Sequence, residues 1–380
     1  MIPFNKPGLS GGELNNIAEA ISNGHAATGG PFTKQCSDFL NDVHHSADAL
    51  LTTSGTDALE TAAMLLGLGS GDVVILPSFT FTSTATAFAR EGAKLRFCDI
   101  DPVTLGMDPN HVKASLSPEV KAIVTVHYAG VPSNIDELVE IAENAGIPLV
   151  EDNAHGFFAT HNGQPLGTFG RMSTLSFHET KNFHCGEGGA LILNDESDVD
   201  RAHILLDKGT NRRQFLNGSV DKYTWQGLGS SFGLSDLLAG FLFAQFEHAN
   251  EIRSQRRTVA ETYQRLLEPQ AAELGIGLLS LPSSATAADH MYYVILPDAA
   301  KRSSVISKMR EASIHPTFHY VPLHTAPGAQ ALADRFQDCP VTDDISARLL
   351  RLPFYNALTE TEIGTVVDVF VDAVKGSGNE

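Results

Sequence analysis

The stretch Ser173-Thr-Leu-Ser-Phe-His-Glu-Thr-Lys-Asn182, followed by the glycine-rich Gly186-Glu-Gly-Gly189, decides how this chain is interpreted. An apolar run ends at Ser176-Phe177, and a lysine comes shortly afterwards. A lysine that forms a Schiff base must lose its proton, reach a carbonyl group and then move aside, and a short loop with glycines suits those needs. Taken alone, Lys181 is more simply interpreted as an exposed loop lysine.

The residues around this stretch alternate short apolar runs with helical patterns. Strands are expected over 72–77, 93–98, 121–127, 147–152, 172–177 and 189–193, and helices over 82–91, 110–115 and 136–145. This alternation predicts βαβ units and an α/β fold, with a mostly parallel sheet covered by helices on both faces. Ligands of such sheets bind beyond the carboxyl ends of the strands, where we place His127, Asp152 and Ser176.

The C-terminal third has a different pattern. Residues 233–267 are mostly helical, and they lead to strands expected over 291–296 and 315–320 and helices expected over 303–312 and 359–373. A chain of 380 residues, 42% of them hydrophobic, can build two cores. We therefore predict a large domain over 1–245 and a smaller α+β domain over 246–380.

The composition excludes several classes of protein. The formal net charge of -19 repels nucleic acid backbones and anionic membrane surfaces, so neither is an expected partner. The first residues do not form a signal peptide, and no apolar run is long enough to cross a membrane, so we expect a cytoplasmic protein. The four cysteines are far apart, which argues against a zinc site or a disulfide framework, and no metal is expected: Cys36, Cys98, Cys185 and Cys339.

A second pattern places a carboxylate at the end of a strand, in Val150-Glu-Asp-Asn-Ala-His155. Pyridoxal phosphate (PLP) withdraws electrons only while its pyridine nitrogen stays protonated, and a buried aspartate keeps it so. Asp152 suits that role. On its own, it is equally well explained as a solvated strand-end acid or a helix cap.

Two further patterns suit a phosphate and an aromatic ring. Thr53-Ser-Gly-Thr-Asp-Ala58 opens a helix with small residues, whose free N–H groups and hydroxyls bind phosphate. Taken alone, an ordinary capping sequence explains it more simply. In Pro77-Ser-Phe-Thr-Phe-Thr82, Phe79 and Phe81 are each available either to stack on a ring or to pack in the core.

In combination, the phosphate turn, the aromatic residue, the aspartate and the lysine occur in an order that resembles the fold-type I PLP enzymes. More narrowly, the chain resembles the DegT/DnrJ/EryC1/StrS family of sugar aminotransferases over nearly its whole length. The resemblance is closest to the branch that acts at C4 of dTDP-4-oxo-6-deoxyglucose, as in the enterobacterial common antigen pathway. The matching segments are 176–182, 186–189, 208–212, 220–225, 229–232 and 318–320.

The resemblance implies a set of cofactor contacts. Lys181 would bind PLP covalently and move a proton, and Asp152 would pair with the pyridine nitrogen. His155 stands where the family commonly has a glutamine near the ring hydroxyl, and imidazole can also donate a hydrogen bond there. Ser231 stands where many relatives have an asparagine that reaches the partner subunit's phosphate. The remaining contacts would come from Gly55, Thr56 and Ser176 to the phosphate and from Phe81 to the ring.

The resemblance also implies how substrates bind. His319, Tyr320 and His324 lie in a segment that borders the sugar pocket of relatives. Lys208 and Arg212 belong to a basic cluster that suits a diphosphate, although a solvated face explains it equally well. The expected reaction transfers an amino group from L-glutamate to the dTDP-sugar, in a homodimer with its sites between two subunits.

Two other functions stay open. The enzyme could aminate C3 of a 3-oxo-deoxysugar nucleotide, or the chain could be a catalytically silent PLP-fold regulator. A related class of PLP enzymes removes a hydroxyl from the sugar and has histidine in place of the lysine, and Lys181 argues against that class.

Overall fold

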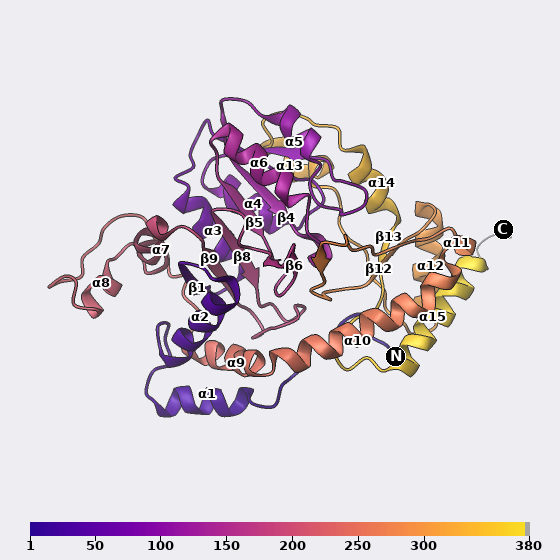
Figure 1. Cartoon of the computed structure of the whole chain (residues 1–380), viewed down its shortest axis with the longest axis horizontal. Helices are drawn as coiled ribbons and strands as arrows, with labels where there is room; N and C mark the ends of the chain where they lie inside the picture. Colours follow the sequence, from indigo (N-terminus) through magenta and orange to yellow (C-terminus); the bar gives the residue numbers. More distant parts are fainter. Residues whose placement is uncertain (377–380) are drawn as a thin grey trace.

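The computed structural model describes residues 1–376, and its centre is a seven-stranded sheet (Figure 1). The strands lie in the order β1 (Asp48–Thr52), β9 (Gly189–Leu193), β8 (Met172–Ser176), β5 (Leu149–Asp152), β4 (Val120–Val126), β2 (Val73–Pro77) and β3 (Lys94–Cys98). All neighbours from β8 to β3 are parallel, and only β9 runs against its neighbours in this sheet. The predicted α/β fold with a mostly parallel sheet is confirmed.

Helices cover both faces of this sheet because alternate residues of each strand point to opposite sides. In β2, Val74 and Leu76 face one apolar cluster, and Val73 and Ile75 face another. The first cluster lies under α3 (Gly55–Leu65), α4 (Thr82–Arg90) and α7 (Val199–Leu206). The opposite face is covered by α5 (Pro109–Ser115), α6 (Ile135–Ala145), α2 (Pro31–His44) and α9 (Asp236–Glu247).

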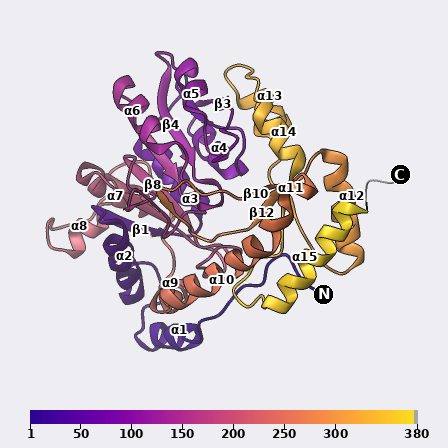
Figure 2. The ribbon, with the colours of Figure 1, turned by 45° about the vertical axis from the view of Figure 1, so that its right-hand side comes forward.

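The C-terminal part builds a separate apolar core around a small antiparallel sheet of β10 (Gly277–Leu278), β12 (Tyr293–Ile295) and β13 (Leu349–Arg351). Three helices pack around it, and Figure 2 shows them side by side: α10 (Ala249–Leu267), α12 (Ala299–Glu311) and α15 (Glu360–Lys375). Ile2, at the other end of the chain, belongs to the same core. The division into domains at residue 245 stays a prediction, and residues 377–380 of its second range lie outside the described part.

Shorter elements complete the structure. The remaining helices are α1 (Glu13–Ser22), α8 (Arg212–Leu216), α11 (Ala271–Leu274), α13 (Pro327–Leu332) and α14 (Pro340–Arg348), with 3-10 turns at Tyr128–Gly130, Glu196–Asp198, Glu268–Gln270 and Leu323–Thr325. A third small sheet joins β11 (Ala285–Thr286), β6 (Thr160–His161) and β7 (Gln164–Pro165). α8 projects from the body of the molecule at the left of Figure 1.

One expectation for the C-terminal third differs from the structure. Residues 315–320 do not form a strand: in the part of the chain that the structure describes, the bridges near them are Ile314 with Ile2 and Thr317 with Arg351. Pro316, which has no N–H to donate, interrupts the pairing between these two bridges. The stretch over 233–267 is mostly helical, as expected, and the backbone leaves the helical conformation at His248 between α9 and α10.

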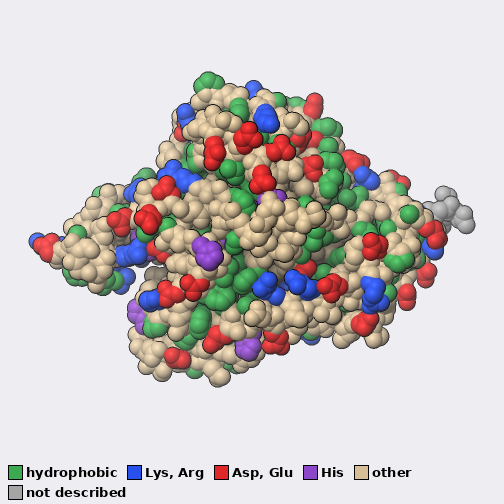
Figure 3. Space-filling view, viewed as in Figure 1, with side chains coloured by type: hydrophobic (Ala, Val, Ile, Leu, Met, Phe, Trp, Pro, Cys, Tyr) green, Lys and Arg blue, Asp and Glu red, His purple; other side chains and the backbone are tan. Residues whose placement is uncertain are grey.

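The surface carries its charges in a mixed pattern. On the face shown in Figure 3, acidic and basic side chains are interspersed rather than gathered into areas of one sign. Within residues 1–376, no helix combines the length and apolar character needed to cross a bilayer.

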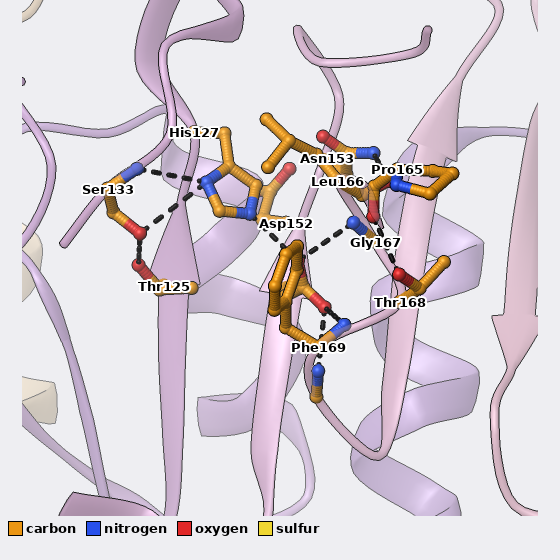
Figure 4. Close-up of polar contacts among 12 residues, drawn as sticks. Thr125, His127, Ser133, Asp152, Asn153, Pro165, Leu166, Gly167, Thr168 and Phe169 are labelled. Carbon is orange, nitrogen blue, oxygen red and sulfur yellow. Dashed lines mark hydrogen bonds and ion pairs between the residues drawn. The ribbon is translucent and has the colours of Figure 1, made fainter. Parts of the chain in front are cut away.

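A buried glutamate fixes the end of β5. Glu151 is fully buried, and its two oxygens accept hydrogen bonds from His127 Nε2 at 2.9 Å and from three backbone N–H groups at 2.7 to 2.8 Å. The backbone donors are Gly167, Phe169 and Gly170. Figure 4 shows this turn and the His127 ring converging on the strand that carries Asp152. The glutamate therefore connects β4, β5 and the loop before β8.

This network gives a stability prediction. Glu151→Gln replaces one acceptor oxygen by an amide nitrogen that faces N–H donors in a buried site. We expect the free energy of unfolding to fall by about 2–4 kcal/mol. Urea denaturation followed by circular dichroism measures the change. Glu143→Gln, on the exposed face of α6, is the matched control and should change the value by less than about 0.5 kcal/mol. Equal stability of the two variants would contradict the assignment.

Candidate active site

A cavity of about 510 Å³ opens at the carboxyl ends of β5 and β8. Its wall also includes the first turn of α3, the first turn of α4 and parts of the C-terminal region near residues 290, 319 and 351. It therefore lies where ligands bind in open α/β sheets, beyond the ends of the parallel strands. Its chemically capable side chains come from several elements that lie far apart in the sequence, so only the complete fold assembles the set.

Lys181 lies in a compact loop that follows β8. The loop is closed by hydrogen bonds from the Phe177 N–H to the Gly188 carbonyl at 2.7 Å and from the Lys181 N–H to the His178 carbonyl at 2.9 Å. Its side chain lines the cavity. Burial lowers the pKa of the Lys181 amine to about 8, although the Asp152 carboxylate acts in the opposite direction. About a tenth of the amine is therefore neutral and nucleophilic at pH 7, far more than at the ordinary lysine pKa.

Asp152 ends β5 and faces the same cavity. Its Oδ2 accepts a hydrogen bond from Thr84 Oγ1 at 2.7 Å, and its Oδ1 accepts one from the Ala154 N–H at 3.2 Å. Burial raises the pKa of this carboxyl group, and the hydrogen bond from Thr84 is the largest opposing influence. With one hydrogen bond on each oxygen, the carboxylate keeps acceptor capacity for a cationic N–H donor such as a protonated pyridine.

The first turn of α3 forms a cradle for an anion. Ser54 caps the helix by accepting the Asp57 N–H, and the chain at Gly55 lies so close to β8 that an added Cβ would be 3.0 Å from Ser176 Cβ. Thr56 Oγ1 and Ser83 Oγ share a hydrogen bond of 2.7 Å. Hydroxyls and a helix N-terminus thus meet beside Ser176, an arrangement that binds phosphate.

Two stacked imidazoles form another wall. The rings of His155 and His290 lie 4.3 Å apart with an angle of 17°. His155 Nδ1 accepts the Ala129 N–H at 3.3 Å, so the neutral ring carries its proton on Nε2. Burial, followed by the nearby positive charge of Lys181, lowers the pKa of His155 well below its ordinary value. At neutral pH, His155 is therefore an uncharged hydrogen-bond donor.

His290 is held by residues on both sides. Its Nδ1 and Asn182 Oδ1 are 2.8 Å apart, which links it to the residue next to Lys181. Arg256 of α10 donates hydrogen bonds to the carbonyls of Asp289 at 2.9 Å and His290 at 2.6 Å. The position of this cavity wall thus depends on α10.

The aromatic residues are arranged at the mouth of the cavity. Phe81 precedes α4, is 59% exposed and lines the cavity, whereas Phe79 is fully buried in a core cluster. Tyr320 and His319 stack on each other at 4.0 Å and 8°, and the Phe81 and Tyr320 ring centres are 6.4 Å apart. Of the two phenylalanines that the sequence offered, Phe81 is the one available to a ligand.

Nine of the residues singled out from the sequence meet around this cavity. They are Gly55, Thr56, Phe81, Asp152, His155, Ser176, Lys181, His319 and Tyr320. Their assigned contacts with a cofactor or substrate remain proposals. His127 was expected at the same edge, but its ring is buried against Glu151 and does not line the cavity.

Four other candidates lie elsewhere. His324 is buried outside the cavity, where its Nδ1 pairs with Ser78 Oγ at 2.7 Å. Lys208 and Arg212 lie near the projecting α8 and pair with Asp207, at 2.9 Å and 3.7 Å. Ser231 forms a backbone bridge with Asp207 in the same region. Within a single chain, the structure does not bring these four residues to the cavity.

Sequence reasoning missed several residues that line this cavity, and four of them carry polar groups that bear on its chemistry. Ser83 and Thr84 come from the first turn of α4, where a hydroxyl-rich helix start was a usable signal. His290 and Arg351 come from the C-terminal region. No local pattern marks these two residues, because their role arises only from the packing of the C-terminal part against the sheet.

Comparison with known proteins gives a consistent result. A sequence model described as the DegT/DnrJ/EryC1/StrS aminotransferase family matches residues 9–371. The chain is 32% identical to a pleiotropic regulatory protein of Geobacillus stearothermophilus, over 83% of this chain and 82% of that protein. It is 30% identical to the dTDP-4-dehydro-2,3,6-trideoxy-D-glucose 4-aminotransferase of Saccharopolyspora spinosa, over 99% of this chain and 97% of that enzyme.

Solved structures have the same fold. The aminotransferase TlmJ from Streptoalloteichus hindustanus superposes with a TM-score of 0.90 at 28% identity, covering 99% of this chain and all of that one. The 3-amino-5-hydroxybenzoic acid synthase superposes with a TM-score of 0.87 at 27% identity and 96% coverage of each chain. With the family model matching nearly its whole length and with a lysine and an aspartate lining the same cavity, this chain belongs to the DegT/DnrJ/EryC1/StrS aminotransferase family, whose members depend on PLP.

Proposed function

We infer that this enzyme transfers an amino group from L-glutamate to C4 of dTDP-4-oxo-6-deoxyglucose, giving the 4-amino-4,6-dideoxy sugar nucleotide. One observation carries the aminotransferase part of this proposal: the Lys181 amine and the Asp152 carboxylate line one cavity, opposite a helix start suited to phosphate. The sugar and the C4 position are supported by the resemblance of the sequence and by the name of the Saccharopolyspora spinosa relative.

The residues present fit PLP. Lys181 would bind its aldehyde carbon, Asp152 would accept the pyridine N–H, and the first turn of α3 with Ser176 would hold its phosphate. When bound, PLP supplies a carbonyl that exchanges for an amine and a ring that withdraws electrons from the neighbouring carbon. Phe81 would contact the ring from the mouth of the cavity. The Nε2–H of His155 would donate to the ring hydroxyl, in place of the glutamine that is common in the family.

The protein's own groups then carry the proton chemistry. Once released, the Lys181 amine is a base at neutral pH, so it can take a proton from the donor's α-carbon and later deliver one to the sugar carbon. Asp152 stays buried under its hydrogen bonds from Thr84 and Ala154, so its position is fixed during both half-reactions. Because both substrates use the same cavity in turn, the proposed kinetics are ping-pong.

A homodimer is part of this proposal. The arm around α8 exposes several large apolar side chains, including Leu216, Trp225 and Leu228, which are 66%, 77% and 72% exposed. Exposed apolar groups of this size mark association surfaces. In a dimer, Ser231, Lys208 and Arg212 of one copy would approach the other copy's cavity, with Ser231 near the cofactor phosphate and the two basic residues near the nucleotide diphosphate. His324 would support the sugar pocket indirectly, through Ser78.

The two alternatives predict different outcomes of one assay. A C3-aminotransferase would require a 3-oxo sugar and would give a 3-amino product. A silent regulator would give no product, and the name of the Geobacillus stearothermophilus relative is the observation that keeps this alternative open. The complete set of lysine, aspartate and phosphate-binding turn favours catalysis over regulation.

The first prediction concerns the product. The purified enzyme, incubated with PLP, L-glutamate and dTDP-4-oxo-6-deoxyglucose, should form a 4-amino-4,6-dideoxy sugar nucleotide together with 2-oxoglutarate. Mass spectrometry and NMR identify the product and its stereochemistry. A parallel reaction with the 3-oxo isomer should be at least about 100-fold slower in kcat/KM. A preference for the 3-oxo isomer would overturn the C4 assignment.

The second prediction concerns Lys181. Lys181→Ala should remove the visible absorbance of the lysine-bound cofactor and lower kcat by at least about 1,000-fold. Borohydride should attach the cofactor to the wild-type chain but not to this variant, and peptide mass spectrometry locates the attachment. Lys113→Ala, on the exposed face of α5, is the control and should keep both properties. Cofactor fixed at another lysine would refute the role of Lys181.

The third prediction concerns pH. Only the neutral Lys181 amine attacks the cofactor aldehyde, and its pKa of about 8 lies below the ordinary value of 10.5. The neutral fraction therefore rises through pH 8 and is nearly complete by pH 9. Stopped-flow mixing of cofactor-free enzyme with PLP should show a binding rate that is half-maximal near pH 8, after correction with a free lysine derivative. A rate still rising tenfold per unit at pH 10 would contradict this assignment.

A further inference from the structure

His290 belongs to a segment of the cavity wall whose backbone is strained. The residue before it, Asp289, has a φ of 50°, in the left-handed region that favours glycine. Arg256 holds this conformation by donating hydrogen bonds to the carbonyls of both residues, at 2.9 Å to Asp289 and 2.6 Å to His290. Such strain persists where the surroundings impose it, and it is typical of functional sites. The ring of His290 is therefore a candidate for a chemical role.

The same segment packs closely against the turn next to His155. An added Cβ at Gly130 would lie 2.6 Å from Ala288 Cβ and 2.8 Å from the carbonyl oxygen of His155. Gly130 also has a φ of 79°, so a glycine is required here for both reasons. This close approach accompanies the stack of the His155 and His290 rings at 4.3 Å, and it fixes the plane of the His290 imidazole.

Asn182 fixes the tautomer of His290. Its Nδ2 donates to the Ala288 carbonyl at 2.6 Å, so its Oδ1 is the atom that faces His290 Nδ1 at 2.8 Å. Because an amide oxygen only accepts, the imidazole hydrogen lies on Nδ1 and Nε2 keeps its lone pair. Burial lowers the pKa of His290 well below its ordinary value, so the ring is neutral at pH 7. Within residues 1–376, Nε2 makes no hydrogen bond and is not closed off from the cavity.

The other histidines of the cavity wall present no such lone pair. Each has one ring nitrogen that accepts a hydrogen bond from a group that can only donate, so the other nitrogen carries the hydrogen. They are His155, His178 and His319, with the Ala129 N–H at 3.3 Å, the Thr180 N–H at 3.2 Å and Arg351 Nη1 at 2.6 Å as the respective donors. Among the cavity histidines in the described part of the chain, His290 is thus the one with an unoccupied acceptor.

A small second space adjoins Lys181 and brings this acceptor into relation with its amine. The space has a volume of about 10 Å³, and its wall includes Lys181, Asn182 and His290. That volume corresponds to about one water molecule, which needs at least about two polar partners to stay in a buried site. The Lys181 amine and the lone pair of His290 Nε2 are two such partners.

We propose that His290 is a positioning residue for Lys181: its Nε2 accepts a hydrogen bond from the released amine through one water molecule in this space. The inference rests on the proposed function, in which that amine takes a proton from one carbon and delivers one to another. An amine held by one of its hydrogens directs its lone pair toward the reacting carbon. After the amine takes the proton, the same contact stabilises the ammonium group. The neutral imidazole adds no charge and does not remove the proton.

Two variants separate the two nitrogens of the ring. His290→Asn puts an amide nitrogen near the position of Nδ1, so it keeps the contact with Asn182 but has no atom at the position of Nε2. His290→Gln is longer and puts an acceptor oxygen near the position of Nε2. His45→Asn, at an exposed position after α2, is the matched control. Cofactor content and melting temperature check each variant.

The kinetic test uses the half-reaction of the holoenzyme with L-glutamate, followed in single turnovers by the absorbance of the cofactor. The rate should fall about 30-fold in His290→Asn and less than about fivefold in His290→Gln, and it should stay unchanged in His45→Asn. Deuterium at the α-carbon of glutamate should slow His290→Asn by a larger factor than the wild type, because proton transfer then limits the rate. A role in packing alone predicts the opposite order, since His290→Asn keeps the contact with Asn182.

A structural measurement tests the same contact without turnover. In crystals of the wild-type enzyme that carries the aminated cofactor, the Lys181 amine is free. A high-resolution structure of this form should show one ordered water within about 3.2 Å of both Lys181 Nζ and His290 Nε2. Nitrogen NMR of the same form should show the hydrogen of His290 on Nδ1.

Each of several results would rule out the proposal. They are a loss of rate in His290→Gln as large as in His290→Asn, an unchanged isotope effect in His290→Asn, a hydrogen on Nε2 of His290, and the absence of a water that reaches both atoms. A wrong assignment of the sugar would leave these measurements intact, because neither the glutamate half-reaction nor the crystal structure involves a sugar nucleotide.

Discussion

The end of strand β5 places two carboxylates on successive residues, and the alternation of a strand sends them to opposite sides. Glu151 points into the protein, where its carboxylate accepts hydrogen bonds from His127 and from three backbone N–H groups of the following loop. Asp152 points into the cavity, where Thr84 holds it. The carboxylate of Glu151 fixes the end of β5, and the carboxylate of Asp152 therefore has a defined position in the cavity. The Lys181 loop follows β8, which pairs directly with this strand.

The cavity joins groups whose charges influence each other because water is largely excluded. Burial shifts the Lys181 amine toward its neutral form and the Asp152 carboxyl toward its protonated form, and each partner acts against the shift of the other. Two neutral histidines, His155 and His319, provide hydrogen bonds without adding charge. The guanidinium of Arg351 is the exception, since no acid in the described part of the chain offsets it. The positive charge of Arg351 is therefore not compensated within the cavity, and it favours ligands that bring a negative charge.

Much of the architecture could be predicted from local sequence. The strands of the parallel sheet follow short apolar runs, and Lys181, Asp152 and the turn at Gly55 were recognisable because each directly follows such a run. His290 and Arg351 could not be found in this way, because they reach the cavity only when the C-terminal core packs against the sheet. The strand expected over 315–320 was wrong because Pro316 removes a donor in the middle of an otherwise β-like segment. The contacts of Ser231, Lys208 and Arg212 involve a second copy in our proposal, so one chain cannot reveal them.

The long helix α10 begins after the break at His248 and leads from the sheet to the C-terminal core. A helix of 19 residues is about 28 Å long, so a tilt of about 5° at this break displaces its far end by about 2.5 Å. Arg256 in this helix donates hydrogen bonds to the carbonyls of residues 289 and 290. The apolar face of the helix packs in the C-terminal core. A change in the tilt of this helix would therefore be transmitted through Arg256 to the cavity wall at His290, beside Lys181. Two substrates of different bulk could then be fitted in succession without any rearrangement of the sheet.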